Sequence, residues 1–244
     1  GHISYVELDG DTANNLEAAA AFRRKPGALY RKLRDLEEGA GVSEGMRKAE
    51  ALIESLTDKE SAQEAYEEMQ ETLSSVLDEA AEAPEDFLDL RTLQSCQKQL
   101  ALAGSLSREE NYQIPVEING ELTEINLKIL HGTETGKVNV TVQTEEFGQI
   151  TAKFSLRGQR VSGYIACESR EGTTWLQGRQ EELEKALTAL GGEGSRRETG
   201  SLVILQGREV NGEDYTEEDI NGGEGQQTAE LYGIAKAFIT TLTA

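Results

Sequence analysis

The chain has 244 residues, of which 37% are apolar and 28% are charged, as is typical of a globular protein with one large or two modest domains. Its formal charge is −21, from 45 acidic and 24 basic residues, so nucleic acid and anionic membrane surfaces are unfavourable partners. No apolar run reaches membrane-spanning length and no signal peptide is recognisable, although an initial Gly in place of Met leaves a removed segment or a longer parent protein open.

The first half of the chain has the periodicity of helices. Apolar residues recur at spacings of three and four between residues 11 and 106, with prolines and glycines at intervals. One such stripe predicts a helix over residues 43–56, and Thr57 with Glu60 forms a capping-box pattern that predicts the start of the next one. We therefore expect a bundle of four or five helices within a domain of residues 1–108.

The period then changes to the alternation that is typical of strands. The dipeptide Asn119-Gly120 separates the first two alternating runs and predicts a two-residue hairpin turn, because both turn positions need a positive φ. Five strands are expected, at residues 114–118, 125–129, 138–142, 150–156 and 161–167.

One helix is expected from about residue 171 until Gly191-Gly192, followed by a buried strand at residues 201–205. The fold class is therefore α+β: an N-terminal helical bundle, then a small mixed domain of five to six strands with one packed helix. A flexible acidic loop and a C-terminal amphipathic helix that docks on the core complete the chain. The helical bundle is expected at residues 1–108, the mixed domain at 109–206, the acidic loop at 207–227 and the C-terminal helix at 228–244.

No motif predicts an active site. His2 and His131 are the only histidines, and neither lies in a nucleophile motif, which argues against a Ser–His–acid triad. The cysteines and histidines match no zinc-ligand spacing, and Cys96 and Cys167 are more typical of buried free thiols than of a disulfide. The acidic run at residues 211–224 does not have the order of an EF-hand loop. We therefore expect a protein that is not an enzyme and that holds no cofactor and no metal.

Residues 145–205 carry a recognisable order of motifs. A turn at Glu145-Glu146-Phe147-Gly148 is followed by two paired strands at residues 153–156 and 161–165. An amphipathic helix at residues 175–190 comes next and stops at Gly191-Gly192, before a final strand at Leu202-Val203-Ile204. This order resembles the C-terminal domain of the flagellar hook-length control family. With the hairpin at residues 112–130 as an addition, the likeness spans about residues 112–205. The chain departs from the family in lacking a proline before the turn and in having Phe147 in place of leucine.

The resemblance implies a function by contact. Members of this bacterial family switch the class of exported substrate by binding the cytoplasmic part of a flagellar export-gate protein through this domain. A protein partner of that kind is expected, in the cytoplasm, with export through the flagellar apparatus left open and with neither nucleic-acid binding nor membrane insertion. The candidate contact residues are Phe147, Gly148, Arg196 and Arg197. The alternative is a cytoplasmic adaptor or scaffold that binds through its helical half, and a hydrolase with an unrecognised site ranks third.

Overall fold

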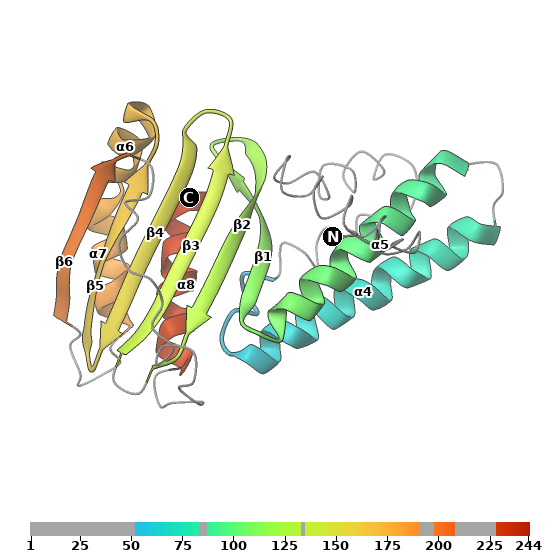
Figure 1. Ribbon diagram of the computed structural model, residues 1–244, viewed down its shortest axis with the longest axis horizontal. Helices are drawn as coiled ribbons and strands as arrows, with labels where there is room; N and C mark the ends of the chain where they lie inside the picture. The colour runs from blue at the N-terminus through green and yellow to red at the C-terminus, as the bar shows by residue number, and fades with distance from the viewer. Residues whose placement is uncertain (1–51, 83–86, 133–134, 191–197, 208–227) are drawn as a thin grey trace, which may run out of the picture.

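The computed structural model describes residues 52–82, 87–132, 135–190, 198–207 and 228–244 (Figure 1). In this part of the chain, five helices accompany a six-stranded sheet. The elements in chain order are α4 (Lys59–Glu82), α5 (Phe87–Ser107), β1 (Asn111–Ile118), β2 (Glu121–Leu130), β3 (Thr135–Thr144), β4 (Gly148–Arg157), β5 (Arg160–Cys167), α6 (Arg170–Gln177), α7 (Gln180–Ala189), β6 (Glu198–Gln206) and α8 (Thr228–Thr243).

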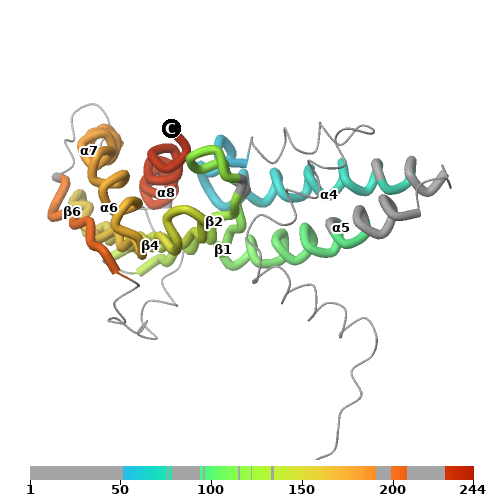
Figure 2. The backbone as a smooth tube through the Cα atoms, turned by 90° about the horizontal axis from the view of Figure 1, so that it is seen from above, coloured from blue at the N-terminus to red at the C-terminus, as the bar shows by residue number. Residues whose placement is uncertain are grey.

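The strands lie in the sheet in the same order as in the sequence, from β1 to β6. The first five pair antiparallel with their neighbours, whereas β6 pairs parallel to β5. A parallel pair needs a crossover connection, and α6 and α7 provide it. Seen from above, α6, α7 and α8 lie together on one face of the sheet, and the opposite face carries none of the described helices (Figure 2).

The alternating runs form strands because one side of each run is covered by these helices. In β3 the valines at 138, 140 and 142 are buried, while Asn139 and Thr141 between them are partly exposed. In β4 the ring of Phe154 packs edge-on against Phe238 of α8, with 5.3 Å between the centroids. The predicted hairpin turn is confirmed: Asn119 and Gly120 have φ values of 50° and 78° between β1 and β2.

Helix α8 covers the middle of the sheet. Seven of its side chains are almost fully buried: Leu231, Tyr232, Ile234, Ala235, Phe238, Ile239 and Leu242. Burial of each large apolar side chain stabilises the fold by about 1.5–3 kcal/mol. Gly136 of β3 allows the close approach, since a Cβ atom there would lie 2.7 Å from side-chain carbons of Leu231.

Helices α4 and α5 form a hairpin that extends from the β1 edge of the sheet (Figures 1 and 2). Their facing sides are buried through Ala62, Tyr66, Met69, Leu73 and Leu77 of α4 and Leu100 and Ala103 of α5. The Tyr66 hydroxyl attaches the hairpin to β1, because it donates to the Gln113 carbonyl at 2.6 Å and accepts from the Gln113 amide at 3.0 Å.

The α+β class is correct, but the predicted N-terminal bundle of four or five helices is not supported. The described part of residues 1–108 holds the α4–α5 pair, and the helices expected before residue 52 lie outside the described residues. Residues 52–55, near the end of the helix predicted over residues 43–56, form turns instead. Leu52 and Leu56 are nevertheless buried in the common core, so their apolar spacing reflects packing against the rest of the protein and not a helix.

Two further local predictions need correction. The single helix expected from residue 171 is broken at Gly178-Arg179 into α6 and α7, and the break lets both Leu176 and Leu183 be buried. The cap of α4 is Asp58 and not Thr57, because a carboxylate oxygen of Asp58 accepts from the Ser61 amide at 2.7 Å. Beyond Gly207, the predicted acidic loop lies outside the described residues, and the division into domains stays a prediction.

None of the described helices is long and apolar enough to cross a membrane.

Candidate functional site

The turn between β3 and β4 positions one aromatic side chain beneath α6. The Thr144 hydroxyl accepts a hydrogen bond from the Phe147 amide at 3.0 Å, which closes the turn. Gly148 follows with a φ of 71°, the left-handed conformation that glycine adopts without steric cost. The turn directs the Phe147 side chain inward, where it is 3% exposed.

Helix α6 lies directly on this turn. Its first turn is capped by Ser169, whose hydroxyl accepts from the Gly172 amide at 2.9 Å. A Cβ atom at Gly172 would lie 2.4 Å from the sulfur of Cys167 and 2.8 Å from the Cβ of Phe147, so glycine lets the helix approach this closely. The Cys167 thiol is free and buried, and burial raises its pKa. This neutral thiol therefore serves packing, and the side chain of Cys96 lies outside the described part.

Trp175, the only tryptophan of the chain, stands on the next turn of α6 and is partly exposed. Its ring lies over Phe147, with 5.1 Å between the centroids. The guanidinium carbon of Arg179 lies 3.9 Å from the centroid of the same ring, which is cation–π geometry. Two neighbours therefore fix the orientation of a large, partly exposed aromatic side chain.

A surface hollow of about 570 Å³ opens beside Trp175, and we call it the Trp175 hollow. Phe147 and Trp175 form its aromatic part, and the rest is polar or charged: Asn119, Glu146, Arg170, Glu171 and Thr174. The amide of Asn119 donates to a carboxylate oxygen of Glu146 at 2.6 Å and so joins the β1–β2 turn to the β3–β4 turn. An aromatic surface with charges of both signs at its rim is suited to contact with a polypeptide segment.

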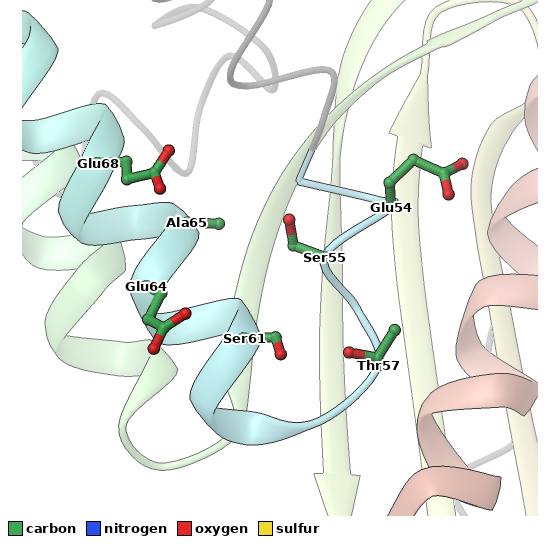
Figure 3. Close-up of a pocket in the computed structure, with 7 residues that line it drawn as sticks. All are labelled: Glu54, Ser55, Thr57, Ser61, Glu64, Ala65 and Glu68. Atoms are coloured by element: carbon green, nitrogen blue, oxygen red, sulfur yellow. The ribbon is translucent and has the colours of Figure 1, made fainter.

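A second hollow, of about 340 Å³, lies where the turns before α4 meet that helix (Figure 3). Its lining includes the carboxylates of Glu54, Glu64 and Glu68 and the hydroxyls of Ser55, Thr57 and Ser61. The Glu54 carboxylate pairs with the Lys236 ammonium of α8 at 2.8 Å. Among the described residues, no group of three or more acidic, cysteine or histidine side chains is placed to hold a metal ion.

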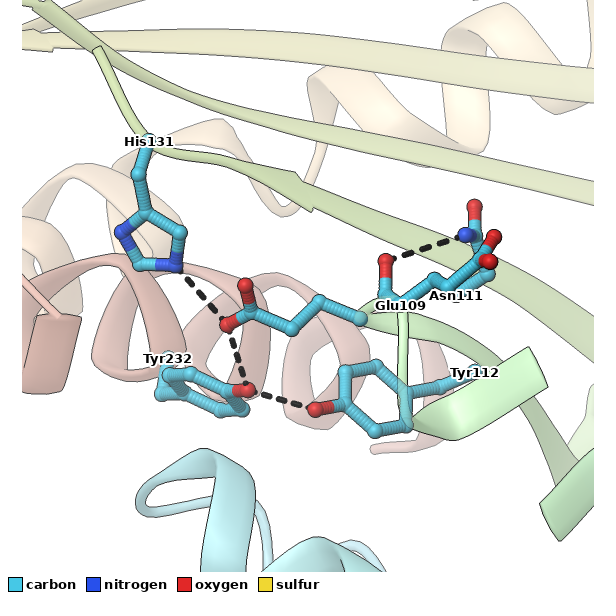
Figure 4. A network of polar contacts seen from close by, with 6 residues as sticks. Glu109, Asn111, Tyr112, His131 and Tyr232 are labelled. Atoms are coloured by element: carbon cyan, nitrogen blue, oxygen red, sulfur yellow. Dashed lines mark hydrogen bonds and ion pairs between the residues drawn. The ribbon is translucent and has the colours of Figure 1, made fainter. Parts of the chain in front are cut away.

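His131 belongs to a buried polar network (Figure 4). Its Nε2 donates to the Glu110 carboxylate at 2.8 Å, and the Tyr232 hydroxyl donates to the same oxygen at 2.9 Å. The Tyr112 hydroxyl then donates to that of Tyr232. Burial works to raise the pKa of Glu110, but the bonds from His131 and Tyr232 outweigh it and leave this pKa below its usual value. The network joins the start of β1, the end of β2 and α8, and His131 lines neither hollow.

The structure brings together only part of the predicted contact site. Phe147 lines the Trp175 hollow and Gly148 supports the turn behind it, whereas Arg196 and Arg197 lie outside the described residues. Sequence reasoning did not single out Trp175, which lines this hollow, although the only tryptophan of a chain poor in aromatic residues was an available signal. No local signal could have placed Asn119 beside it.

Comparison of the chain with protein-family models, with curated proteins and with solved structures gives no match.

Proposed function

We propose that the protein is a non-catalytic interaction module, related in function to flagellar hook-length control, and that a partner segment docks on the Trp175 hollow. The observation that carries this proposal is the exposed part of Trp175, whose ring is oriented by Phe147 and Arg179 at the edge of a surface hollow. Tryptophan and arginine are the residues on which binding energy concentrates in protein interfaces.

The hollow is already formed in the free chain. Because Phe147 and the guanidinium of Arg179 already hold the ring of Trp175 in place, little side-chain entropy of Trp175 is lost when a partner binds there. The charged rim, with Glu146, Arg170 and Glu171, supplies groups that orient a partner and reject others.

The resemblance to the hook-length control family supports the choice of partner. The stretch that carries the resemblance includes the β3–β4 turn and α6, the elements that build most of the Trp175 hollow. That family acts by binding the cytoplasmic part of a flagellar export-gate protein, so a protein of that kind is the proposed partner.

The test is calorimetric titration of the whole chain with the cytoplasmic domain of an export-gate protein. The single tryptophan offers a second readout, since a partner in the hollow changes the fluorescence of Trp175 directly. Trp175→Ala should weaken binding by about tenfold or more, the loss that is typical of a central interface tryptophan.

The matched control is Leu102→Ala, which shortens an exposed apolar side chain on α5, far along the chain from the hollow. It should leave affinity unchanged. The second candidate function is an adaptor that binds through its helical hairpin, and the observation that favours it is the 42% exposure of Leu102. Loss of binding in Leu102→Ala, together with unchanged binding in Trp175→Ala, would favour this second candidate. No binding by the folded wild-type chain would remove the proposed partner.

A further inference from the structure

Strand β6 forms one edge of the sheet and is uncharged along most of its length. Figure 1 shows it at the free end of the row of strands, and in the described part of the chain β5 is its single neighbour. Residues 199–206 contain no charged side chain and no proline. Edge strands of natural proteins are usually protected from pairing by charges, prolines or bulges. The register shift beside β6 lies opposite its first residues, so the ladder is regular from Leu202 onward.

Two apolar side chains of β6 project from the face of the sheet that is opposite α6 and α7. Val203 is 42% exposed and Leu205 is 39% exposed, and they are two of the three large apolar side chains exposed among the described residues. Leu202 and Ile204, which alternate with them, pack against the common core. The strand is therefore anchored through one face and leaves an apolar strip in water on the other, where burial would be favourable.

The backbone of β6 also presents hydrogen-bonding groups along the open edge. The Gly207 amide donates to the Cys167 carbonyl at 2.8 Å, so the odd-numbered residues from 203 to 207 turn their backbone groups toward β5. The groups of Ile204 and Gln206 point the other way, where the described strands provide no neighbour. Such an edge is a template for one more strand.

We propose that β6 pairs with β6 of a second copy of this chain, antiparallel and about a two-fold axis at Ile204. This register sets the exposed Val203 of each copy opposite the exposed Leu205 of the other, on the same face of a continuous sheet. A two-fold contact needs a patch that complements itself, and apolar side chains on both sides of the axis meet this condition.

The charge of the chain favours a second copy as the occupant. Two copies that each carry a formal charge of −21 repel one another, so they approach most easily where no acidic side chains face each other. Residues 199–206 provide such a surface, and a charged peptide would find no side chain there to orient it. One pair of strands buries less than the standard interface of about 1,600 Å², so the dimer is reversible and depends on protein concentration.

The experiment is sedimentation velocity of the whole chain over a wide range of concentrations, at low and at physiological salt. The test variant combines Val203→Lys with Leu205→Lys, which places lysines directly opposite each other across the two-fold axis. The matched control combines Ala101→Lys with Leu102→Lys, which adds the same charge at two exposed positions of α5. Circular dichroism confirms that both variants are folded.

The wild-type chain should form a reversible dimer, and the test variant should raise its dissociation constant by about tenfold or more while the control stays within about twofold. Physiological salt should tighten the wild-type dimer, because it screens the repulsion between the copies. A chain that stays monomeric at every concentration, equal weakening in both variants, or a dimer that salt weakens would each overturn the proposal.

Mild oxidation tests the register. A mixture of Val203→Cys and Leu205→Cys chains should form a disulfide between positions 203 and 205, identified by mass spectrometry, because directly opposed positions lie within disulfide range. Either variant alone should not link through its new thiol, and linking to the same extent would overturn the two-fold at Ile204. Trp175→Ala should dimerise as the wild type does, since no residue of β6 lines the Trp175 hollow.

Discussion

The guanidinium carbon of Arg179 lies 3.9 Å from the ring centroid of Trp175, although Trp175 belongs to α6 and Arg179 lies just beyond the end of that helix. Arg179 stands at the break between α6 and α7, and its position there lets it reach back over the last turn of α6. The residue at the break therefore helps to orient Trp175, which lines the hollow.

Replacing Arg179 with Ala should lower both the stability of the protein and its affinity for the proposed partner, without unfolding the protein. An exposed cation–π contact contributes about 0.5–1 kcal/mol, so we expect a loss of that size in the free energy of unfolding. Binding of the proposed partner should fall by several-fold, because the ring of Trp175 would be less well oriented. Chemical denaturation and calorimetry measure the two effects. Arg170→Ala, which removes a rim charge from the same hollow, is the control for loss of charge alone, and an equal loss of stability in that variant would contradict the role given to the stacking.

Gly172→Ala should destabilise the protein by about 1–3 kcal/mol, because the added methyl group must push against Cys167 and Phe147 in a packed region. The tryptophan fluorescence of the native state should also change, since movement of Phe147 alters the contact with Trp175. Thermal unfolding monitored by fluorescence checks both effects.

Gly178→Ala is the matched control for that variant. The nearest atoms to a Cβ there are at 3.5 and 3.7 Å, and the φ of −64° suits any residue. Its stability should be unchanged or higher by up to about 1 kcal/mol, because alanine reduces the entropy of the unfolded chain. Equal destabilisation of both variants would show that the close approach of α6 to the β3–β4 turn is not what requires Gly172.

Glu124 should make stability depend on pH. Burial raises the pKa of its carboxyl from a usual value near 4.5 to about 8, and its Oε2 has no hydrogen-bond partner within the described ranges. The folded state holds this proton more tightly than the unfolded chain does. The stabilisation that comes from the protonated Glu124 carboxyl is therefore fully present below about pH 4.5. As the pH rises from there toward 8, the free energy of unfolding falls by about 1.4 kcal/mol per pH unit.

Glu124→Gln should remove that dependence, because the amide carries no proton to lose. We expect the free energy of unfolding at pH 7 to rise by about 3 kcal/mol and its decline between pH 5 and 8 to flatten. Urea denaturation at a series of pH values provides the measurement, with Glu117→Gln at an exposed position of β1 as the control. Parallel pH profiles for wild type and Glu124→Gln would contradict the raised pKa.

Tyr232→Phe should cost about 1–2 kcal/mol of stability at pH 7, because it removes the donor to the partly buried Glu110 carboxylate and the acceptor of the Tyr112 hydroxyl. Since the folded pKa of Glu110 lies below its usual value, its stabilising contribution is present above that value and is lost as the pH falls through the folded pKa. The variant should therefore lose less stability than wild type on acidification. Tyr164→Phe, on the face of β5 away from the helices, is the control and should behave as wild type.

The sequence by itself determined the elements whose signals are local. Alternation predicted the first five strands, because one side of each is covered by helices, and Asn119-Gly120 located the first hairpin since its φ values depend on those two residues. The strand predicted as buried at residues 201–205 is instead the edge strand β6, in which Val203 and Leu205 are exposed. The buried face of α8 was visible as spacing along the chain. The same spacing misled at Leu52 and Leu56, where turns place apolar side chains in the core.

Only the tertiary structure decided how distant segments meet. The break between α6 and α7 and the layer of three helices on one face of the sheet depend on strand order and register. The Trp175 hollow requires Asn119, Glu146 and Trp175 to converge from three separate parts of the chain. Such convergence leaves no local signal, because the energy that holds it comes from packing between elements and not from preferences within them.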